Sequence, residues 1–259
     1  MDEWSSSRRS PLSLVLLFCL TFSGCLQEAP RPSPDQSKAL LAVLLKDHNH
    51  EVRRTAVESL GKIGDPTVVP SVVPLLTDSI PLVRGAAAQA LGRLATPADE
   101  GAVAGLTEAL ADPADNVRQA AAMAIGDIEP SPRQLAVITM LAQAADVRVR
   151  RTVVHALQSL DTSHVASALL PLVDDSDAEV RQGAVACFGN SDDVRAGRVL
   201  KQRLAQDPSP AVRAQAAYHL GEVRGIDARS VLQAAAATEQ DSGVRRWIEA
   251  ELRSLRGSD

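Results

Sequence analysis

Apolar residues recur along most of the chain at intervals of four, in blocks that return about every thirty residues. In each block a valine is followed by apolar residues four and eight positions later. Residues four apart lie on one face of an α-helix, so each block predicts a helix with one buried stripe. The stripe residues are Val52, Ala56, Leu60, Val83, Ala87, Leu91, Val117, Ala121, Ile125, Val149, Val153, Leu157, Val180, Ala184, Phe188, Val212, Ala216, Leu220, Val244, Ile248 and Leu252.

A Val-Arg dipeptide marks each block and returns seven times at spacings of 31 to 34 residues. Its arginines are Arg53, Arg84, Arg118, Arg150, Arg181, Arg213 and Arg245. Periodicity of this length is typical of a solenoid, in which each unit buries its apolar face only against its neighbours. Seven units account for nearly all of the chain after residue 36.

A turn is predicted before each of these helices. Aspartate stands six residues before the arginine in five units, namely Asp47, Asp78, Asp112, Asp175 and Asp207. Pro81 and Pro210 lie where the first helical turn begins, a position that tolerates a missing N–H. Apolar segments such as 72–76 and 102–110 precede the aspartates and predict a first helix, so each unit is expected to be a helical hairpin.

The combined pattern is Asp-x5-Arg followed by Val-Arg-x2-Ala-x3-Leu-Gly, as in residues 83–92. It resembles HEAT repeats, in particular the short type found in bilin lyases, over about residues 36–256. The resemblance implies an all-α fold, an α-α solenoid of about seven HEAT-like hairpins wound as a right-handed superhelix. The fourth unit departs from the pattern with Ala144 and Gln158, and the seventh departs with Glu239 and Arg253.

The recurring arginines and aspartates have two interpretations, an anion-binding row or a structural ladder. The resemblance to HEAT repeats implies that each arginine pairs with turn aspartates of its own and neighbouring units. The two charges recur together and nearly cancel, which favours the ladder. The expected ladder comprises Asp47, Arg53, Asp78, Arg84, Asp112, Arg118, Arg150, Asp175, Arg181, Asp207, Arg213 and Arg245.

Composition and charge narrow the possible partners. The chain is 45% apolar but only 2% aromatic, which predicts helices that approach closely through small side chains. Its formal net charge is −5 and no basic block stands out, so nucleic acid is not expected as a partner.

The N-terminus predicts export. Arg8 and Arg9 precede an apolar run over 11–22 that is too short to span a bilayer comfortably, as in a secretion signal. Residues 22–25, Phe-Ser-Gly-Cys, resemble the lipobox of bacterial lipoproteins, which implies that Cys25 is lipidated and that the protein is held at a bacterial envelope membrane. An ordinary signal peptide, a buried apolar segment and a twin-arginine signal are the alternatives.

The predicted organisation follows from these segments. Residues 1–24 form the signal peptide, 25–36 the lipidated cysteine and a proline-rich extended tether, 37–256 the solenoid and 257–259 a tail. Cys187 is then the one thiol in the body of the mature chain, on an apolar helix face where a small core residue is expected.

Catalytic candidates are few. The His50–Glu51 pair raises the possibility of a metal site, because deoxyhypusine hydroxylase is a HEAT-like enzyme whose His-Glu pairs bind iron. The matching positions inside the second helices here hold no His-Glu, and His50–Glu51 is expected to precede its helix. No residue carries over from the bilin lyases as catalytic, so we expect no metal, no cofactor and no enzymatic activity. A bilin-lyase-like or other small-molecule enzyme stays the main alternative.

Recognition is the function that the pattern favours. Second helices usually line the concave face of a solenoid, and positions two, three and six after each valine are expected to face outward. The partner-binding candidates are Glu58, Gln89, Met123, His155, Tyr218 and Trp247. Trp247 has an alternative role as part of a C-terminal cap. We therefore predict a monomeric, membrane-anchored scaffold that binds other proteins, with a purely structural spacer as a further alternative.

Overall fold

The structure is a computed structural model that describes residues 33–160, 165, 169–191, 193–223 and 227–255. The described residues from Lys38 onward belong to one compact unit. The predicted signal peptide, Cys25 and most of the predicted tether lie outside the described residues. Within those residues no helix is long and apolar enough to cross a membrane.

Regular structure in the described ranges is entirely helical, which confirms the predicted fold class. Each Val-Arg block forms the second helix of a unit. These second helices are α3 (His50–Ile63), α5 (Pro81–Leu94), α7 (Asp115–Ile128), α9 (Val147–Gln158), α11 (Ala178–Gly189), α13 (Pro210–Leu220) and α15 (Ser242–Ser254). The preceding segments contain α2 (Pro34–Leu44), η1 (Pro66–Val68), α4 (Val69–Val72), η2 (Val73–Thr77), α6 (Glu100–Ala109), α8 (Pro132–Met140), η3 (Leu141–Gln143), η4 (Leu170–Asp174), α12 (Ala196–Gln206) and α14 (Ala228–Thr238).

The first helix of the second unit is broken into η1, α4 and η2. Pro66, Pro70 and Pro74 follow one another at intervals of four, and each lacks the N–H that would continue an α-helix. The chain therefore alternates between short 3₁₀ and α segments, although the apolar pattern alone predicts one simple helix.

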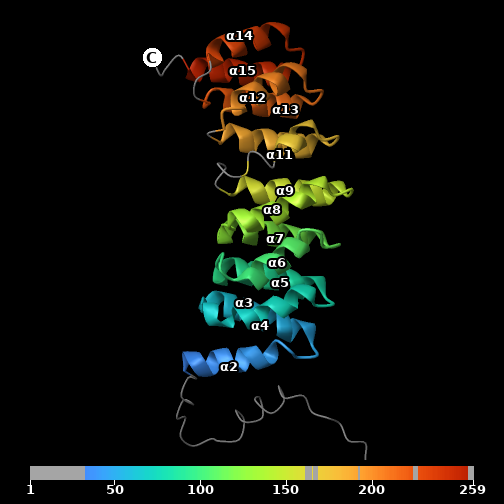
Figure 1. The fold of residues 1–259 in the computed structure, drawn as a ribbon, viewed down its shortest axis with the longest axis vertical. Coiled ribbons are helices and arrows are strands. Elements are labelled where there is room, and N and C mark those ends of the chain that lie inside the picture. The colour runs from blue at the N-terminus through green and yellow to red at the C-terminus, as the bar shows by residue number, and fades with distance from the viewer. Residues whose placement is uncertain (1–32, 161–164, 166–168, 192, 224–226, 256–259) are drawn as a thin grey trace, which may run out of the picture. The chain divides into compact units, whose positions relative to one another are not determined.

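The second helices stack in chain order, each in contact with the next, as Figure 1 shows from α3 to α15. The apolar stripe lies in the core: all of its residues are buried except Val52 and Leu252, which are partly buried. These two belong to the first and last second helices, which have a neighbouring second helix on one side only. The four-residue spacing thus predicted the core correctly, because burial along a stacked helix is set by helical periodicity.

Close approach between second helices depends on the glycine that follows the large stripe residue. A Cβ at Gly61 would lie 3.0 Å from the Cβ of Ala90, and a Cβ at Gly92 would lie 2.8 Å from the Cα of Ala124. Both glycines sit inside helices, where glycine costs about 1 kcal/mol relative to alanine. The repeated Leu-Gly pair therefore reflects backbone packing between units.

Substitution of Gly92 tests this packing. Gly92→Ala is expected to lower the free energy of unfolding by about 1–3 kcal/mol, because its Cβ would press on the α7 backbone. Gly101→Ala is the matched control, since Gly101 is exposed in α6 and a Cβ there meets nothing within 4 Å. The control should be neutral or stabilising by up to about 1 kcal/mol in urea unfolding. Equal effects of the two variants would contradict the packing argument.

Candidate functional site

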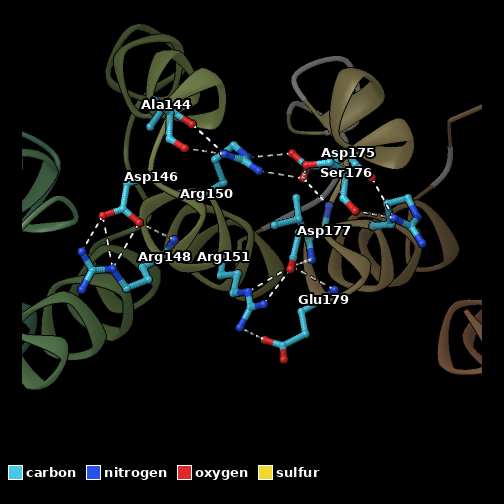
Figure 2. A network of polar contacts seen from close by, with 12 residues as sticks. Ala144, Asp146, Arg148, Arg150, Arg151, Asp175, Ser176, Asp177 and Glu179 are labelled. Carbon is cyan, nitrogen blue, oxygen red and sulfur yellow. Dashed lines mark hydrogen bonds and ion pairs between the residues drawn. The ribbon is translucent and has the colours of Figure 1, made fainter.

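Each arginine of the ladder holds two successive turns together. Arg53 in α3 donates from Nε and Nη2 to both oxygens of Asp78, at 2.7 and 2.9 Å, in the turn of the next unit. Its Nη1 donates at 2.7 Å to the backbone carbonyl of Asp47, in the turn of its own unit. Figure 2 shows the same arrangement around Arg150, between the carbonyl of Ala144 and the carboxylate of Asp175. A planar guanidinium suits this double contact because its donors form a rigid fork.

The bidentate contact recurs at five of the six junctions between units. The pairs are Arg53–Asp78, Arg84–Asp112, Arg150–Asp175, Arg181–Asp207 and Arg213–Glu239, with N···O distances of 2.7 to 2.9 Å. Glu239 supplies the carboxylate of the seventh unit, so its departure from the repeat pattern preserves the contact. Arg245, in the last unit, donates to the backbone carbonyl of Glu239.

The geometry shows how a ladder aspartate is shared between two arginines. Each arginine was expected to pair with turn aspartates of its own and neighbouring units. Asp78 accepts from Arg84 of its own unit through its backbone carbonyl, while its carboxylate accepts from Arg53 of the preceding unit. The carboxylate also accepts the N–H two residues later, at 2.9 Å from Ile80 to Asp78. One side chain therefore closes its own turn and ties that turn to the preceding unit.

Burial makes the ladder a structural element. The side chain of Asp207 is 0% exposed and that of Arg181 is 9% exposed. Burial raises the pKa of Asp207, but the hydrogen bonds and charge of Arg181 outweigh it and hold the pKa below its ordinary value. Hydrogen bonds from Arg53 likewise lower the pKa of Asp78. These carboxylates are ionised at neutral pH and their arginines are engaged, so the ladder pairs are poor candidates for binding a partner.

The His50–Glu51 pair belongs to the start of α3. Asn49 is the N-cap, and its side chain accepts the backbone N–H of Glu51 at 2.9 Å. The pair was expected just before the helix and instead forms its first two residues, since Asn49 takes the capping role. Within the described ranges, no three His, Cys, Asp or Glu side chains gather where they could hold a metal ion.

Cys187 is a core residue, as predicted. Its side chain is buried in α11, and burial raises the pKa of the thiol to about 12. A thiol in this state has little thiolate at neutral pH, which makes it an inert packing group.

The outward surface of the second helices is narrower than the periodicity predicts. Position three was expected to face outward, but Ala86, Ala120 and Gly183 at that position are buried. Each second helix from α5 to α13 contacts a second helix on both flanks, and a Cβ at Gly183 would overlap the Val154 side chain of α9. Stacking thus covers positions that a single amphipathic helix would leave exposed. We call the remaining exposed strip of α3 to α15 the second-helix face.

An aromatic hollow of about 360 Å³ lies on this face over α11, α13 and α15. It is lined by Gln182, Ala211, Ala214, Gln215, Tyr218 and Trp247. Tyr218 is 43% exposed and Trp247 is 54% exposed. Two exposed rings and two amide side chains, supplied by three consecutive units, thus surround one open volume. The walls can offer apolar contact together with hydrogen bonds of either sense.

His219 supports the aromatic hollow from below. Its ring is buried against Gly189, lies 4.9 Å from the Tyr218 ring in an edge-to-face arrangement, and has Nε2 at 2.9 Å from the Gln215 amide nitrogen. Burial lowers the pKa of His219, so the ring is neutral at pH 7. Contacts to both Tyr218 and Gln215 restrict the motion of these two side chains, which reduces the entropy that binding would cost.

A second, polar hollow of about 340 Å³ lies over α7, α9 and α11. Its lining includes Gln119, Arg151, His155 and Gln158. Arg151 is already paired: it donates to Asp177 at 2.6 Å and contacts Glu179 at 2.8 Å, as Figure 2 shows. The charge of Arg151 is therefore balanced within the protein, and this hollow presents amides and an imidazole more than a free cation.

The six partner-binding candidates are spread over the second-helix face. Tyr218 and Trp247 share the aromatic hollow, and His155 lines the polar hollow. Gln89 and Met123 are exposed on α5 and α7, outside these two hollows. Glu58 is engaged within α3, where its carboxylate accepts a hydrogen bond from Arg54 at 3.2 Å.

Sequence reasoning overlooked the amide side chains that complete the aromatic hollow. Gln182 and Gln215 stand at positions two and three of their blocks, which were expected to face outward, but they were not selected beside the aromatic residues. The available signal was a glutamine next to small residues on a helix, Gly183 beside Gln182 and Ala214 and Ala216 on either side of Gln215. Only the stacking shows that these amides lie next to Tyr218 and Trp247.

Comparison with known proteins identifies the same repeated helical units. A family model described as HEAT repeats matches residues 37–126, 103–189 and 166–253. The chain is 32% identical over 155 residues to the uncharacterized phycocyanin operon protein Z of Pseudanabaena tenuis, covering 57% of this chain and 76% of that protein. It is 41% identical over 107 residues to the 26S proteasome regulatory subunit RPN2 of Eremothecium gossypii, covering 40% of this chain but 12% of that subunit.

Solved structures resemble the chain at low sequence identity. The complex of CpcE and CpcF of phycocyanin lyase from a Nostoc species is 19% identical with a TM-score of 0.47, covering 90% of this chain and 98% of that one. Human deoxyhypusine hydroxylase is 22% identical with a TM-score of 0.39, covering 83% of each chain. These likenesses concern the fold alone.

Removal of one ladder carboxylate tests the structural interpretation. Asp207→Ala leaves the buried guanidinium of Arg181 without its paired carboxylate and should lower the free energy of unfolding by about 3–5 kcal/mol. Arg148→Ala is the control, because the Arg148–Asp146 pair is solvent-exposed, at 60% and 41%, and should cost less than about 1 kcal/mol. Urea unfolding of both variants at pH 7 measures the difference. A loss below about 1 kcal/mol for Asp207→Ala would rule out a stabilising ladder.

Proposed function

The chain belongs to the HEAT-repeat proteins, and we propose that it is a scaffold that binds another protein through its second-helix face without catalysis of its own. The observation that carries the proposal is the aromatic hollow, in which Tyr218 and Trp247 lie exposed in a chain with few aromatic residues. Exposed aromatic side chains grouped in one hollow mark the places where protein partners are anchored.

Energetics favour the aromatic hollow over the rest of the face. Full burial of a large apolar side chain contributes about 1.5–3 kcal/mol, so completing the burial of two half-exposed rings adds on the order of 1.5–3 kcal/mol toward the roughly 8 kcal/mol of a micromolar affinity. The His219 contacts hold Tyr218 and Gln215 in place before binding. Gln182 and Gln215 can pair with the polar backbone of a partner, which is required once water is displaced.

Trp247 is assigned here to the contact surface in preference to a C-terminal cap. A capping side chain would be covered by its own helical layer, whereas the Trp247 residue is 54% exposed and lines a hollow shared with α11 and α13. The charged remainder of α15 supplies the polar outer face that a terminal repeat needs.

The membrane part of the proposal comes from the N-terminal sequence. We propose that Cys25 is lipidated and that the proline-rich residues after it hold the solenoid near an envelope membrane. A tether of this composition extends by about 3 Å per residue, which places the second-helix face within reach of other envelope proteins.

Bilin handling is the second candidate function. It is favoured by the 32% identity to the phycocyanin operon protein Z and by the imidazole and amides of the polar hollow, groups that can bond to a tetrapyrrole. Absorbance of added phycocyanobilin discriminates between the two: a bilin-binding protein shifts the spectrum and loses the shift in His155→Ala, whereas a protein scaffold leaves the spectrum unchanged.

The aromatic hollow can be tested by partner capture. Tyr218→Ala with Trp247→Ala should lower capture of the partner from detergent-solubilised envelopes by about tenfold or more, because both anchors are lost. The melting temperature should stay close to that of the wild type, since both side chains are about half exposed. Met140→Ala removes an apolar side chain that is 73% exposed in α8 and serves as the control. Unchanged capture by the double variant would refute the proposed face.

Lipidation is tested independently by Cys25→Ala. The wild-type protein should partition with membranes and incorporate a palmitate analogue, whereas the variant should do neither, because the thiol that accepts the lipid is absent. Cys187→Ala is the matched control and should keep both properties. A Cys25→Ala protein that stays membrane-bound, with neither form labelled, would contradict the proposed anchor.

A further inference from the structure

The ladder is interrupted at one junction, between the third and fourth units. Ala144 stands where the other turns have aspartate or glutamate, so the next unit offers no carboxylate to Arg118. Arg118 is nevertheless buried, with a side chain that is 5% exposed. The five arginines that have their carboxylate are between 9% and 16% exposed. The junction therefore contains a buried cation without the bidentate partner found at every other junction.

The guanidinium of Arg118 is oriented like those of the intact junctions. Its Nη1 donates to the carbonyls of Asp112 and Pro113 at 2.6 and 3.2 Å, which matches the contacts of Arg84 with Asp78 and Ser79. In the intact junctions this anchoring turns the Nε and Nη2 edge toward the next unit. Among the described residues no hydrogen bond starts from the Nε of Arg118, and its Nη2 contacts Asp115 on its own helix.

The turn at Ala144 also keeps the conformation of a carboxylate-containing turn. Ala144 has φ −59° and ψ 140°, close to φ −58° and ψ 148° at Asp175. Asp146, two residues later, has φ −75° and ψ 117°, as the N-cap of α9. In the other six turns the corresponding N–H donates to the turn carboxylate, whereas no described hydrogen bond starts from the N–H of Asp146. The carboxylate of Asp146 is engaged by Arg148, as Figure 2 shows.

We propose that this junction is a binding site for a carboxylate supplied from outside the chain. The Nε and Nη2 of Arg118 and the backbone N–H of Asp146 are the same three donors that hold a turn carboxylate elsewhere in the array, and Ala144 supplies no carboxylate to them. A guanidinium edge binds the two oxygens of a carboxylate together, so a planar carboxylate is favoured over a spherical anion such as chloride. The carboxylate of Asp115, whose side chain is 75% exposed, already contacts Nη2 of Arg118. Asp115 therefore competes with the incoming anion for this donor.

The carboxylate has two possible sources, a small free acid or an acidic side chain of a bound protein. The site lies in a turn, where the neighbouring Ala145, Asp146 and Asp115 are exposed, so either source can approach it. It involves neither Tyr218 nor Trp247, and its existence does not depend on the proposed partner surface.

Formate is the probe for the site, tested on the full chain by thermal unfolding. About 0.5 M sodium formate should raise the melting temperature by about 2–4 °C more than sodium chloride of equal ionic strength, because formate binds the folded state. Ala144→Asp places a carboxylate on the same donors and should unfold at a higher temperature, with no formate-specific rise. Ala145→Asp adds the same charge one residue away and should respond to formate like the wild type.

Two further experiments test the competition by Asp115 and the source of the carboxylate. Asp115→Asn should enlarge the formate-specific rise, because the guanidinium loses its alternative acceptor. An acetylated, amidated peptide with aspartate as its one charged residue should reproduce the rise if the site accepts a protein side chain, and should have no effect if it accepts only a free acid. A wild-type protein without a formate-specific rise, or an Ala144→Asp variant that keeps it, would overturn the proposal.

Discussion

The contact on which the rest of the structure depends is the bidentate pairing of an arginine with the turn carboxylate of the next unit. A two-helix hairpin of thirty residues cannot bury its own apolar face, so its stability comes from the neighbour it stacks on. Arg181 and Asp207 fix that neighbour in register with two directional hydrogen bonds, while a third donor of Arg181 closes its own turn at Asp175. Apolar packing drives the stacking, and the guanidinium determines its geometry.

Small residues allow successive second helices to pack closely enough for each arginine to reach the carboxylate of the next turn. Gly61 and Gly92 accept the flank of the following second helix at a distance that a Cβ would not permit. The same closeness removes much of the surface that seven separate helices would expose, which is why Ala86 and Ala120 are buried at a position expected to face outward. Function is consequently confined to the strip that remains, and there the exposed side chains of Tyr218 and Trp247 differ from the alanines around them.

Departures from the repeat have different consequences, and each follows from what the ladder needs. Glu239 replaces aspartate and still binds Arg213 with both oxygens, because the longer side chain reaches the same donors. Ala144 cannot substitute in this way, so Arg118 keeps its buried position with an ion pair to Asp115 but without a carboxylate from the next turn. Comparison of the five junctions that have the bidentate pair with the Arg118 junction thus shows which contact the Arg118 junction lacks.

The sequence by itself determined the class of fold, the helix–turn–helix unit and the residues of the core, because helical periodicity and turn chemistry are local. Val83, Ala87 and Leu91 are buried as their spacing required. It could not determine that the carboxylate of Asp78 belongs to Arg53 while its carbonyl belongs to Arg84, since six residues along the chain and a neighbouring layer are both within reach. Only the tertiary structure decided this, and only stacking placed Gln182, Gln215, Tyr218 and Trp247 around one hollow, because their proximity results from packing between units that are far apart in the chain.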